Sequence, residues 1–269
     1  MNTGLTKEDQ AMIKEAKGNK VSGPIYNEDG LRLLKVLGNP EYLEVKNGVK
    51  AICDEACLGL DNLHDVVLPA SVTDLGTRAF ASCIKLFKIT MPGVDFIGIE
   101  SFAHCENLKE IALPETLGKI WKGAFADCKA LEETNIPSHL KIIDKSAFRN
   151  SGLKSLNIEI SDGGKCLVYD KAFASCKHLE SVYLNKNVKI LERMAFADCT
   201  SLKTIEFEQP SLTCCAGEIN ATMLIGCTSL EKIIVPKNKY NNYPDFNIQG
   251  FESAQFETRD FNSLITPKE

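Results

Sequence analysis

The sequence predicts an α/β repeat solenoid, in which short parallel strands from successive repeats stack into a rod. Three observations indicate this fold. An Ala-Phe pair returns at intervals close to 23 residues, an apolar anchor follows each pair at a nearly fixed distance, and a short stretch of alternating apolar and polar residues follows each anchor. One such copy is too small to bury its own apolar side, so neighbouring copies have to stack.

The repeat keeps its register over about eight copies of 22–28 residues, which we place at residues 42–243. Its key position, phenylalanine in the six inner copies, falls at residues 57, 80, 102, 125, 148, 173, 196 and 224. Most copies carry a cysteine three residues later, and an apolar anchor follows at Leu63, Leu86, Leu108, Leu131, Leu153, Leu179, Leu202 and Leu230. A second row, apolar except for one threonine, consists of Val66, Ile89, Ile111, Thr134, Leu156, Val182, Ile205 and Ile233.

The segment after each anchor is typical of a half-buried strand. In residues 108–114, apolar and polar residues alternate from Glu110 onward, the period of two that places successive side chains on opposite faces. Pro114 then ends the strand, because proline cannot donate a ladder hydrogen bond. A second apolar pair, here Leu117 and Ile120, precedes the next turn. We therefore expect parallel strands about 4.8 Å apart between residues 42 and 235.

The pattern A-F-x-x-C-x-x-L-x-x-I-x-L-P resembles the leucine-rich-repeat superfamily. More narrowly, it is similar to the BspA-like (Treponema pallidum type) subfamily of 23-residue repeats. The resemblance covers residues 42–243, about three quarters of the chain. The sequence departs from the pattern at Ser151, where the cysteine is missing, and in longer copies around residues 163–164 and 214–215, where we expect bulges or loops. The resemblance implies a right-handed superhelix with its parallel strands on the concave face.

Residues 1–41 are expected to form an N-terminal helical cap, because an uncovered first rung would invite pairing with another chain. Thr6, with Asp9 three places later, resembles a helix start, and Gly18 resembles a stop. Residues 28–37 are interpreted as a second short helix, which the sequence Gly-Asn-Pro at residues 38–40 would end. The alternative is that this segment is a separate functional arm.

Residues 244–269 are expected to form a C-terminal cap or tail. They lose the repeat and become polar, but they carry phenylalanines at intervals of five, which fit neither a helix face nor a strand face. We expect an irregular tail packed over the last rung, with a partner-docking peptide as the alternative. The phenylalanines are Phe246, Phe251, Phe256 and Phe261.

Composition and charge exclude several classes of protein. The chain has 269 residues, 44% of them hydrophobic and 25% charged, which is typical of a folded chain. The net charge is −5 and the basic residues are scattered, so we expect no nucleic-acid partner. No stretch reaches the ~18 apolar residues of a membrane span. Residues 1–20 are polar, unlike a signal peptide, and so predict a cytoplasmic location, with a secreted or cell-surface location as the alternative if a leader was removed.

The eleven cysteines are interpreted as structural. One per repeat is expected to line a reduced, buried column, where cysteine behaves as a small apolar residue: Cys83, Cys105, Cys128, Cys176, Cys199 and Cys227. Zinc sites need closely paired ligands, so we expect no metal. We interpret the pairs Cys53–Cys57 and Cys214–Cys215 as accidents of repeat degeneracy. Cys166, in a glycine-rich insertion, is expected to be the most reactive thiol.

The sequence contains no pattern that favours an enzyme. No serine or cysteine stands in a nucleophile-elbow pattern, and residues 161–165 lack the spacing of a phosphate-binding loop. The four histidines occupy non-anchor positions of different repeats, where we expect them to be solvated. We therefore expect no catalysis, no cofactor and no small-molecule substrate.

The outward strand positions form the candidate binding surface, because the curvature of a solenoid exposes one side of its sheet. This strip has no run of cations for phosphates and no stack of aromatic residues for sugars or single strands. A mixed strip of this kind suits a protein or peptide, although it also fits a merely solvated face. We expect the partner to contact Lys88, Glu110, Glu133, Asn135, Asn157, Ser181, Tyr183, Thr204 and Glu206.

Two classes of function remain open at this point. The first is a non-catalytic intracellular scaffold or recognition module, which the many unpaired cysteines favour. The second is a secreted or surface-displayed adhesin that binds host or matrix proteins, which the family resemblance implies. Tyr183 is the expected anchor in either case, because tyrosine is enriched among the residues that dominate interface energetics.

Overall fold

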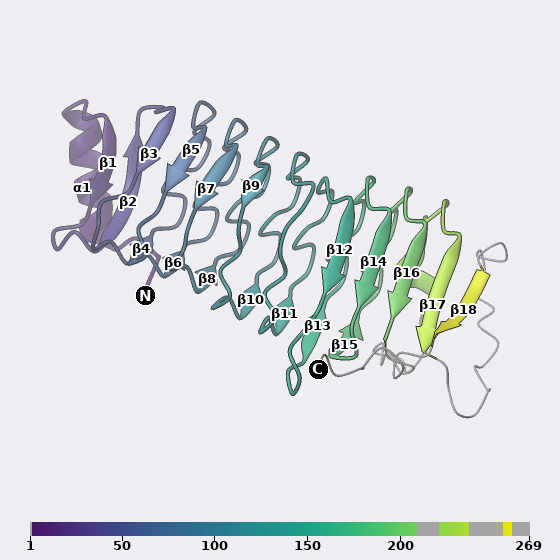
Figure 1. Cartoon of the computed structure of the whole chain (residues 1–269). Helices are drawn as coiled ribbons and strands as arrows, with labels where there is room; N and C mark the ends of the chain where they lie inside the picture. The colour runs from purple at the N-terminus through teal and green to yellow at the C-terminus, as the bar shows by residue number, and fades with distance from the viewer. Residues whose placement is uncertain (1, 209–220, 237–254, 260–269) are drawn as a thin grey trace.

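The computed structural model describes residues 2–208, 221–236 and 255–259. These residues form an elongated rod with two rows of short strands along its length (Figure 1). Neighbouring strands in each row come from successive repeats and, apart from one N-terminal hairpin, run parallel. The predicted repeat solenoid with parallel strands is therefore confirmed.

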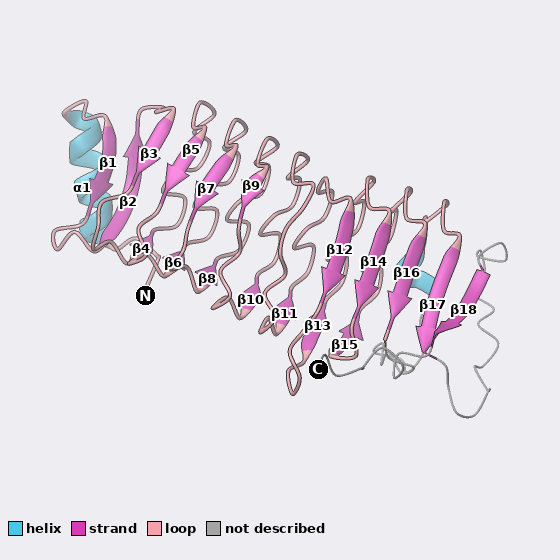
Figure 2. Ribbon diagram, in the orientation of Figure 1, coloured by secondary structure: helices cyan, strands magenta, loops and turns pink. Residues whose placement is uncertain are grey.

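The N-terminal helix α1 (Lys7–Gly18) begins and ends where the sequence predicts. The Thr6 hydroxyl accepts a hydrogen bond from the backbone N–H of Asp9, while the Asp9 carboxylate accepts one from the N–H of Thr6. Two of the helix's unpaired donors are thereby satisfied. The same carboxylate lies 2.6 Å from the Arg32 guanidinium, and Ile13 packs against Leu34 of the first strands. The helix is thus fixed over the first rungs, at the end of the rod seen in Figure 2.

The second predicted helix, at residues 28–37, is wrong. This region contains a hairpin of β1 (Gly23–Tyr26) and β2 (Arg32–Leu37), which pair antiparallel. Strand β2 also pairs in parallel with the strand of the next repeat, so it has a partner on each side. Such tertiary pairing overrides the weak helical preference of a short apolar segment.

The first row is one nine-stranded sheet that begins with this hairpin. Each two-residue strand of the inner repeats carries the second member of the second apolar pair, such as Ile120, which is buried in the core, and the first member, such as Leu117, is buried just before the strand. After β1 and β2, the sheet continues in this order: β4 (Ala51–Ile52), β6 (Asp74–Leu75), β8 (Phe96–Ile97), β10 (Lys119–Ile120), β11 (Ile142–Ile143), β13 (Cys166–Val168) and β15 (Val188–Leu191).

The second row carries the strands that follow the leucine anchors, with one further strand at each end, and it is divided into two sheets. The four-stranded sheet consists of β3 (Tyr42–Glu44), β5 (Asp65–Val67), β7 (Lys88–Thr90) and β9 (Glu110–Ile111). The five-stranded sheet consists of β12 (Ser155–Ile158), β14 (Ser181–Leu184), β16 (Thr204–Phe207), β17 (Lys232–Pro236) and β18 (Gln255–Arg259). A short 3₁₀ helix, η1 (Ala221–Leu224), occupies the turn before β17.

Strand β18 corrects the expectation of an irregular tail for the part of residues 244–269 that the structure describes. It pairs in parallel with β17, and Phe256 lies opposite Ile233, one 23-residue repeat earlier. The chain therefore continues the strand row for one more rung. The other three tail phenylalanines lie outside the described residues.

A stack of phenylalanines, one from each of the six inner repeats, runs through the core. Neighbouring rings lie 5.2–5.5 Å apart between centroids and are nearly parallel. Their side chains are fully buried, as the spacing predicted. The stacked residues are Phe80, Phe102, Phe125, Phe148, Phe173 and Phe196.

The cysteine column runs beside this stack and is buried, also as predicted. Each thiol donates a hydrogen bond to a backbone carbonyl of the preceding repeat; for example, Cys105 Sγ lies 3.1 Å from the oxygen of Phe80. Ser151, which replaces cysteine in one repeat, brings its hydroxyl to 3.3 Å from the thiol of Cys176. The nine cysteines of the described residues are free.

Candidate binding site on the strand face

The second strand row is interrupted in its middle. Residues 132–136 lie between β9 and β12 but form no strand. Thr134 occupies the inward position that is aliphatic in the other copies, and it stays half-buried, whereas Ile89 and Leu156 in the same row are buried. The Thr134 hydroxyl donates a long hydrogen bond of 3.4 Å to the carbonyl of Asn135. Burying a hydroxyl is unfavourable unless its hydrogen bonds are good, so this rung is not drawn into the core as most others are. The neighbouring Ile111 is left only partly covered.

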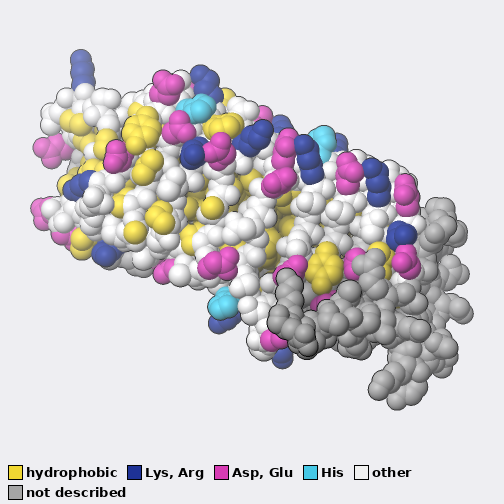
Figure 3. Space-filling model, in the orientation of Figure 1, with side chains coloured by type: hydrophobic (Ala, Val, Ile, Leu, Met, Phe, Trp, Pro, Cys, Tyr) yellow, Lys and Arg dark blue, Asp and Glu magenta, His cyan; other side chains and the backbone are white. Residues whose placement is uncertain are grey.

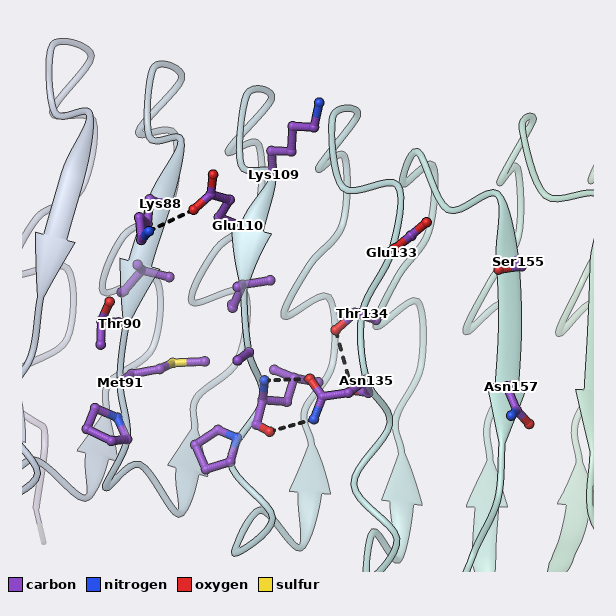
Figure 4. Close-up of a pocket in the computed structure, with 16 residues that line it drawn as sticks. Lys88, Thr90, Met91, Lys109, Glu110, Glu133, Thr134, Asn135, Ser155 and Asn157 are labelled. Atoms are coloured by element: carbon purple, nitrogen blue, oxygen red, sulfur yellow. Dashed lines mark hydrogen bonds and ion pairs between the residues drawn. The ribbon is translucent and has the colours of Figure 1, made fainter.

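The Asn135 side chain takes the place of the missing backbone ladder (Figure 4). Its oxygen accepts a hydrogen bond from the N–H of Leu113 at 2.9 Å, and its amide nitrogen donates one to the carbonyl of Leu113 at 2.8 Å. Asparagine suits this position because its side chain offers one acceptor and two donors on the same planar group. The interrupted rung is thus attached to its neighbour through a side chain.

A groove of about 840 Å³ lies over this interruption. Its floor is apolar and includes Ile89, Met91, Ile111 and Leu113. Five of the nine residues predicted from the sequence line its walls, and Figure 4 shows them arranged around the floor: Lys88, Glu110, Glu133, Asn135 and Asn157. Figure 3 shows the same face, where apolar side chains reach the surface between charged ones.

The walls of the groove carry charges of both signs. The Lys88 ammonium lies 2.8 Å from the Glu110 carboxylate, and this hydrogen bond raises the pKa of Lys88. Both side chains are about half exposed, so solvent screens the pair and it contributes little to stability. Glu133 is exposed on the next rung. The walls of the groove therefore present charges of both signs to solvent.

The other four predicted residues lie outside the groove, on the two rungs after β12. Ser181 and Tyr183 belong to β14, where Tyr183 lies opposite Asn157 on one side and Glu206 on the other. Tyr183 is half-buried, and burial is the largest cause of its raised pKa, followed by the carboxylate of Glu208. A hydrogen bond to the same carboxylate also raises the pKa, so the Tyr183 hydroxyl donates to Glu208. Through β12, these residues extend the surface that begins at the groove.

The apolar floor and the interruption were not predicted. One signal was visible in the sequence, since Thr134 is the single polar residue in an otherwise apolar row. The pairing of Asn135 with Leu113 could not be found in the same way, because it depends on how far apart two backbone segments come to lie.

A comparison with models of known protein families identifies the repeats. The model of the BspA type leucine rich repeat region, in six copies, matches residues 50–163 and 167–265. The chain belongs to the BspA-type leucine-rich-repeat family. This confirms the resemblance seen in the sequence and extends it over the last described rung, β18.

Solved structures that are similar to this chain include bacterial leucine-rich-repeat proteins. A T. pallidum leucine rich repeat protein is 23% identical, with 78% of this chain and 88% of that chain covered and a TM-score of 0.50. A leucine rich cell surface protein from Faecalibacterium prausnitzii is 19% identical, with 79% and 86% covered and a TM-score of 0.41. At these identities the likeness concerns the fold alone. No curated protein matches this BspA-type chain.

The described part of this BspA-type protein contains no group of three or more His, Cys, Asp or Glu residues that could hold a metal ion. The expectation that Cys166 is the most reactive thiol is wrong, because its side chain is fully buried and burial raises its pKa to about 12. The histidines are exposed, as predicted, and His64 stacks on Phe87. Within the described ranges, no helix is long and apolar enough to cross a membrane.

Proposed function

We propose that this BspA-type repeat protein is a non-catalytic recognition module that binds a protein or peptide on the strand face of the β3–β18 row. The observation that carries the proposal is the groove over the interrupted rung, where an apolar floor is surrounded by polar and charged side chains. Protein interfaces have this composition, with an apolar centre and a polar rim. The proposal includes a right-handed superhelix in which this strand face is concave.

An extended segment with one or two apolar side chains suits the groove best. The half-covered Ile111 offers apolar surface that an inserted side chain would remove from water. Lys88, Glu110 and Glu133 would then pair with polar groups beside the inserted side chain. Tyr183 and its neighbours on β14 and β16 would contact the same partner farther along the rod.

The experiment begins with capture of a partner by the full chain and measurement of its affinity for purified variants. Ala112 lines the groove and is exposed, so Ala112→Arg blocks the groove without disturbing the core. We expect affinity to fall at least tenfold, about 1.4 kcal/mol. Tyr183→Ala should weaken binding by a similar factor, because tyrosine anchors commonly contribute about 2 kcal/mol or more. Glu206→Lys should mainly change the association rate and its salt dependence.

The matched control is Lys177→Glu, an exposed substitution outside the groove. It should leave affinity and melting temperature unchanged. Unaltered affinity of both Ala112→Arg and Tyr183→Ala would refute binding on the strand face.

The competing site is the phenylalanine-bearing tail, and truncation at residue 245 is a poor test of it. Deletion would remove β18 and uncover the edge of β17, so lost binding could follow from lost structure. The double substitution Phe246→Ala with Phe261→Ala keeps the sequence of β18 unchanged. Loss of binding in this variant, with full binding by Ala112→Arg, would assign the site to the tail.

The cellular location belongs to the same proposal. Free, buried cysteines fit a reducing compartment and thus an intracellular module. The alternative is a surface-displayed or secreted adhesin. Finding a leader or lipid anchor encoded upstream in the native gene would support the surface-displayed or secreted adhesin.

A further inference from the structure

A second cleft lies on the other strand row, next to the glycine-rich insertion. The repeat that contains Phe148 is two residues longer than the usual 23, and the extra length forms a loop between β12 and β13. Gly163 adopts φ +82°, a left-handed conformation that glycine tolerates best, and the N–H of Gly164 donates to the carbonyl of Ser161 at 3.0 Å. In Figure 1 this loop projects beyond the neighbouring turns below β13.

The insertion and the preceding repeat enclose a cleft of about 600 Å³. Its floor consists of Ile142 of β11 and Leu167 of β13, which lie opposite each other in the parallel pair. Both are only partly buried, whereas their neighbours Ile143 and Val168 point into the core. The outward side of this sheet is therefore apolar at the place where the loop rises beside it.

The rim of the cleft carries an excess of positive charge. The side chains of Lys141 and Lys165 are exposed, and neither ammonium group forms a hydrogen bond or ion pair with any residue that the structure describes. The carboxylate on the rim, Asp162, is already 3.0 Å from the ammonium of Lys186, which lowers the pKa of Asp162. In Figure 3 a histidine and basic side chains lie together at this lower margin of the rod.

Polar groups that can orient a ligand complete the rim. The Nδ1 atom of His139 lies 3.1 Å from the hydroxyl of Ser138 and 3.3 Å from that of Ser161, so two consecutive repeats share this ring. The carboxylate of Glu115 accepts hydrogen bonds from the N–H and the hydroxyl of Ser138, so it points toward Ser138. Lys141 and Lys165 are the two cations of the rim whose ammonium groups have no partner in the part of the chain that the structure describes.

We propose that this cleft is a second docking site, for an acidic peptide segment in which an apolar side chain lies between carboxylates. The apolar side chain would cover Ile142 and Leu167, and the flanking carboxylates would pair with Lys141 and Lys165. Lysine is a compact charge on a flexible stem and can follow a carboxylate without fixed geometry. The site is independent of the groove, because it lies on the other strand row and shares no residue with it.

The test is fluorescence anisotropy with the full chain and a labelled peptide in which one leucine is flanked by glutamates. We expect saturable binding that weakens with salt. The double variant Lys141→Glu with Lys165→Glu should bind at least tenfold more weakly, while Lys177→Glu should bind as the parent does. Ala112→Arg should also bind as the parent does, which separates this site from the proposed function.

Peptide variants and lipid vesicles supply the outcomes that would overturn the proposal. Replacing the leucine by serine should cost affinity, and equal binding of the two peptides would mean that charge alone acts without the apolar floor. An equal loss in Lys177→Glu, or no saturable binding by the parent, would refute the site. Binding of phosphatidylserine vesicles that depends on the same two lysines, with no binding of the peptide, would assign the cleft to a lipid surface.

Discussion

Replacing Phe125 by alanine tests whether the phenylalanine stack holds the repeats together. Its side chain is fully buried, and its ring lies 5.3 Å from that of Phe102 and 5.2 Å from that of Phe148. Emptying an aromatic core site typically costs about 3–5 kcal/mol. Each lost stacking contact is worth about 0.5–1.5 kcal/mol beyond the buried area. Because Phe125 loses two such contacts, we expect a loss toward the upper end of that range.

The measurement is urea denaturation followed by far-ultraviolet circular dichroism and by the fluorescence of Trp121, the single tryptophan. The control is Lys129→Ala on the adjoining turn. Lys129 pairs with Glu106 at 2.7 Å, but both side chains are about half exposed, so the substitution should cost less than about 1 kcal/mol. Equal losses in Phe125→Ala and Lys129→Ala would refute the reasoning, since burial would then not explain the stability of the stack.

Three further predictions concern the interrupted rung and the buried thiols. Asn135→Ala removes two hydrogen bonds to Leu113 and should cost about 1–2 kcal/mol in urea denaturation; no change would mean that water replaces the amide fully. Thiol titration should find the nine described cysteines unreactive in the native protein and reactive after denaturation, and nine fast native thiols would contradict their burial. Burial raises the pKa of Cys53 to about 11 and that of Cys83 to about 12, so these thiols ionise first in the unfolded chain. The contribution of these two thiols to stability should therefore be constant below about pH 8.5 and fall above it, by at most about 1.4 kcal/mol per pH unit per thiol, whereas a flat urea midpoint between pH 8.5 and pH 10.5 would contradict this assignment.

The elements that could be predicted are those in which each residue packs against the residue at the same repeat position in the next repeat. Phe125 and its anchor Leu131 are constrained by identical neighbours on both sides, so spacing alone places them. Strand β2 could not be predicted in this way. It pairs with the hairpin strand β1 on one side and with β4 of the next repeat on the other, so its two neighbours are not copies of one repeat. Strand β18 was missed for a related reason: Phe256 keeps register with Ile233, but the residues around it do not show the repeat pattern.

The candidate site, too, could be predicted only in part. Alternation along a strand determines which side chains point outward, and it placed Lys88, Glu110 and Glu133 on one face. It says nothing about where a ladder is interrupted, so the apolar floor was not foreseen. Cys166 was assigned to a loop because glycines precede it, whereas it begins β13 and is buried beside the core. A glycine-rich sequence indicates where a loop starts but leaves its end undetermined.

The interruption at residues 132–136 also has a mechanical consequence. The rod resembles a beam whose two flanges are the strand rows and whose web is the phenylalanine stack. One flange is continuous from β1 to β15, whereas the other is held across the gap to β9 by the two hydrogen bonds of one side chain, that of Asn135. Bending that stretches this flange therefore meets least resistance there. The flexural weak point of the beam coincides with the groove, so an inserted partner would act as a wedge that sets the curvature of the whole rod.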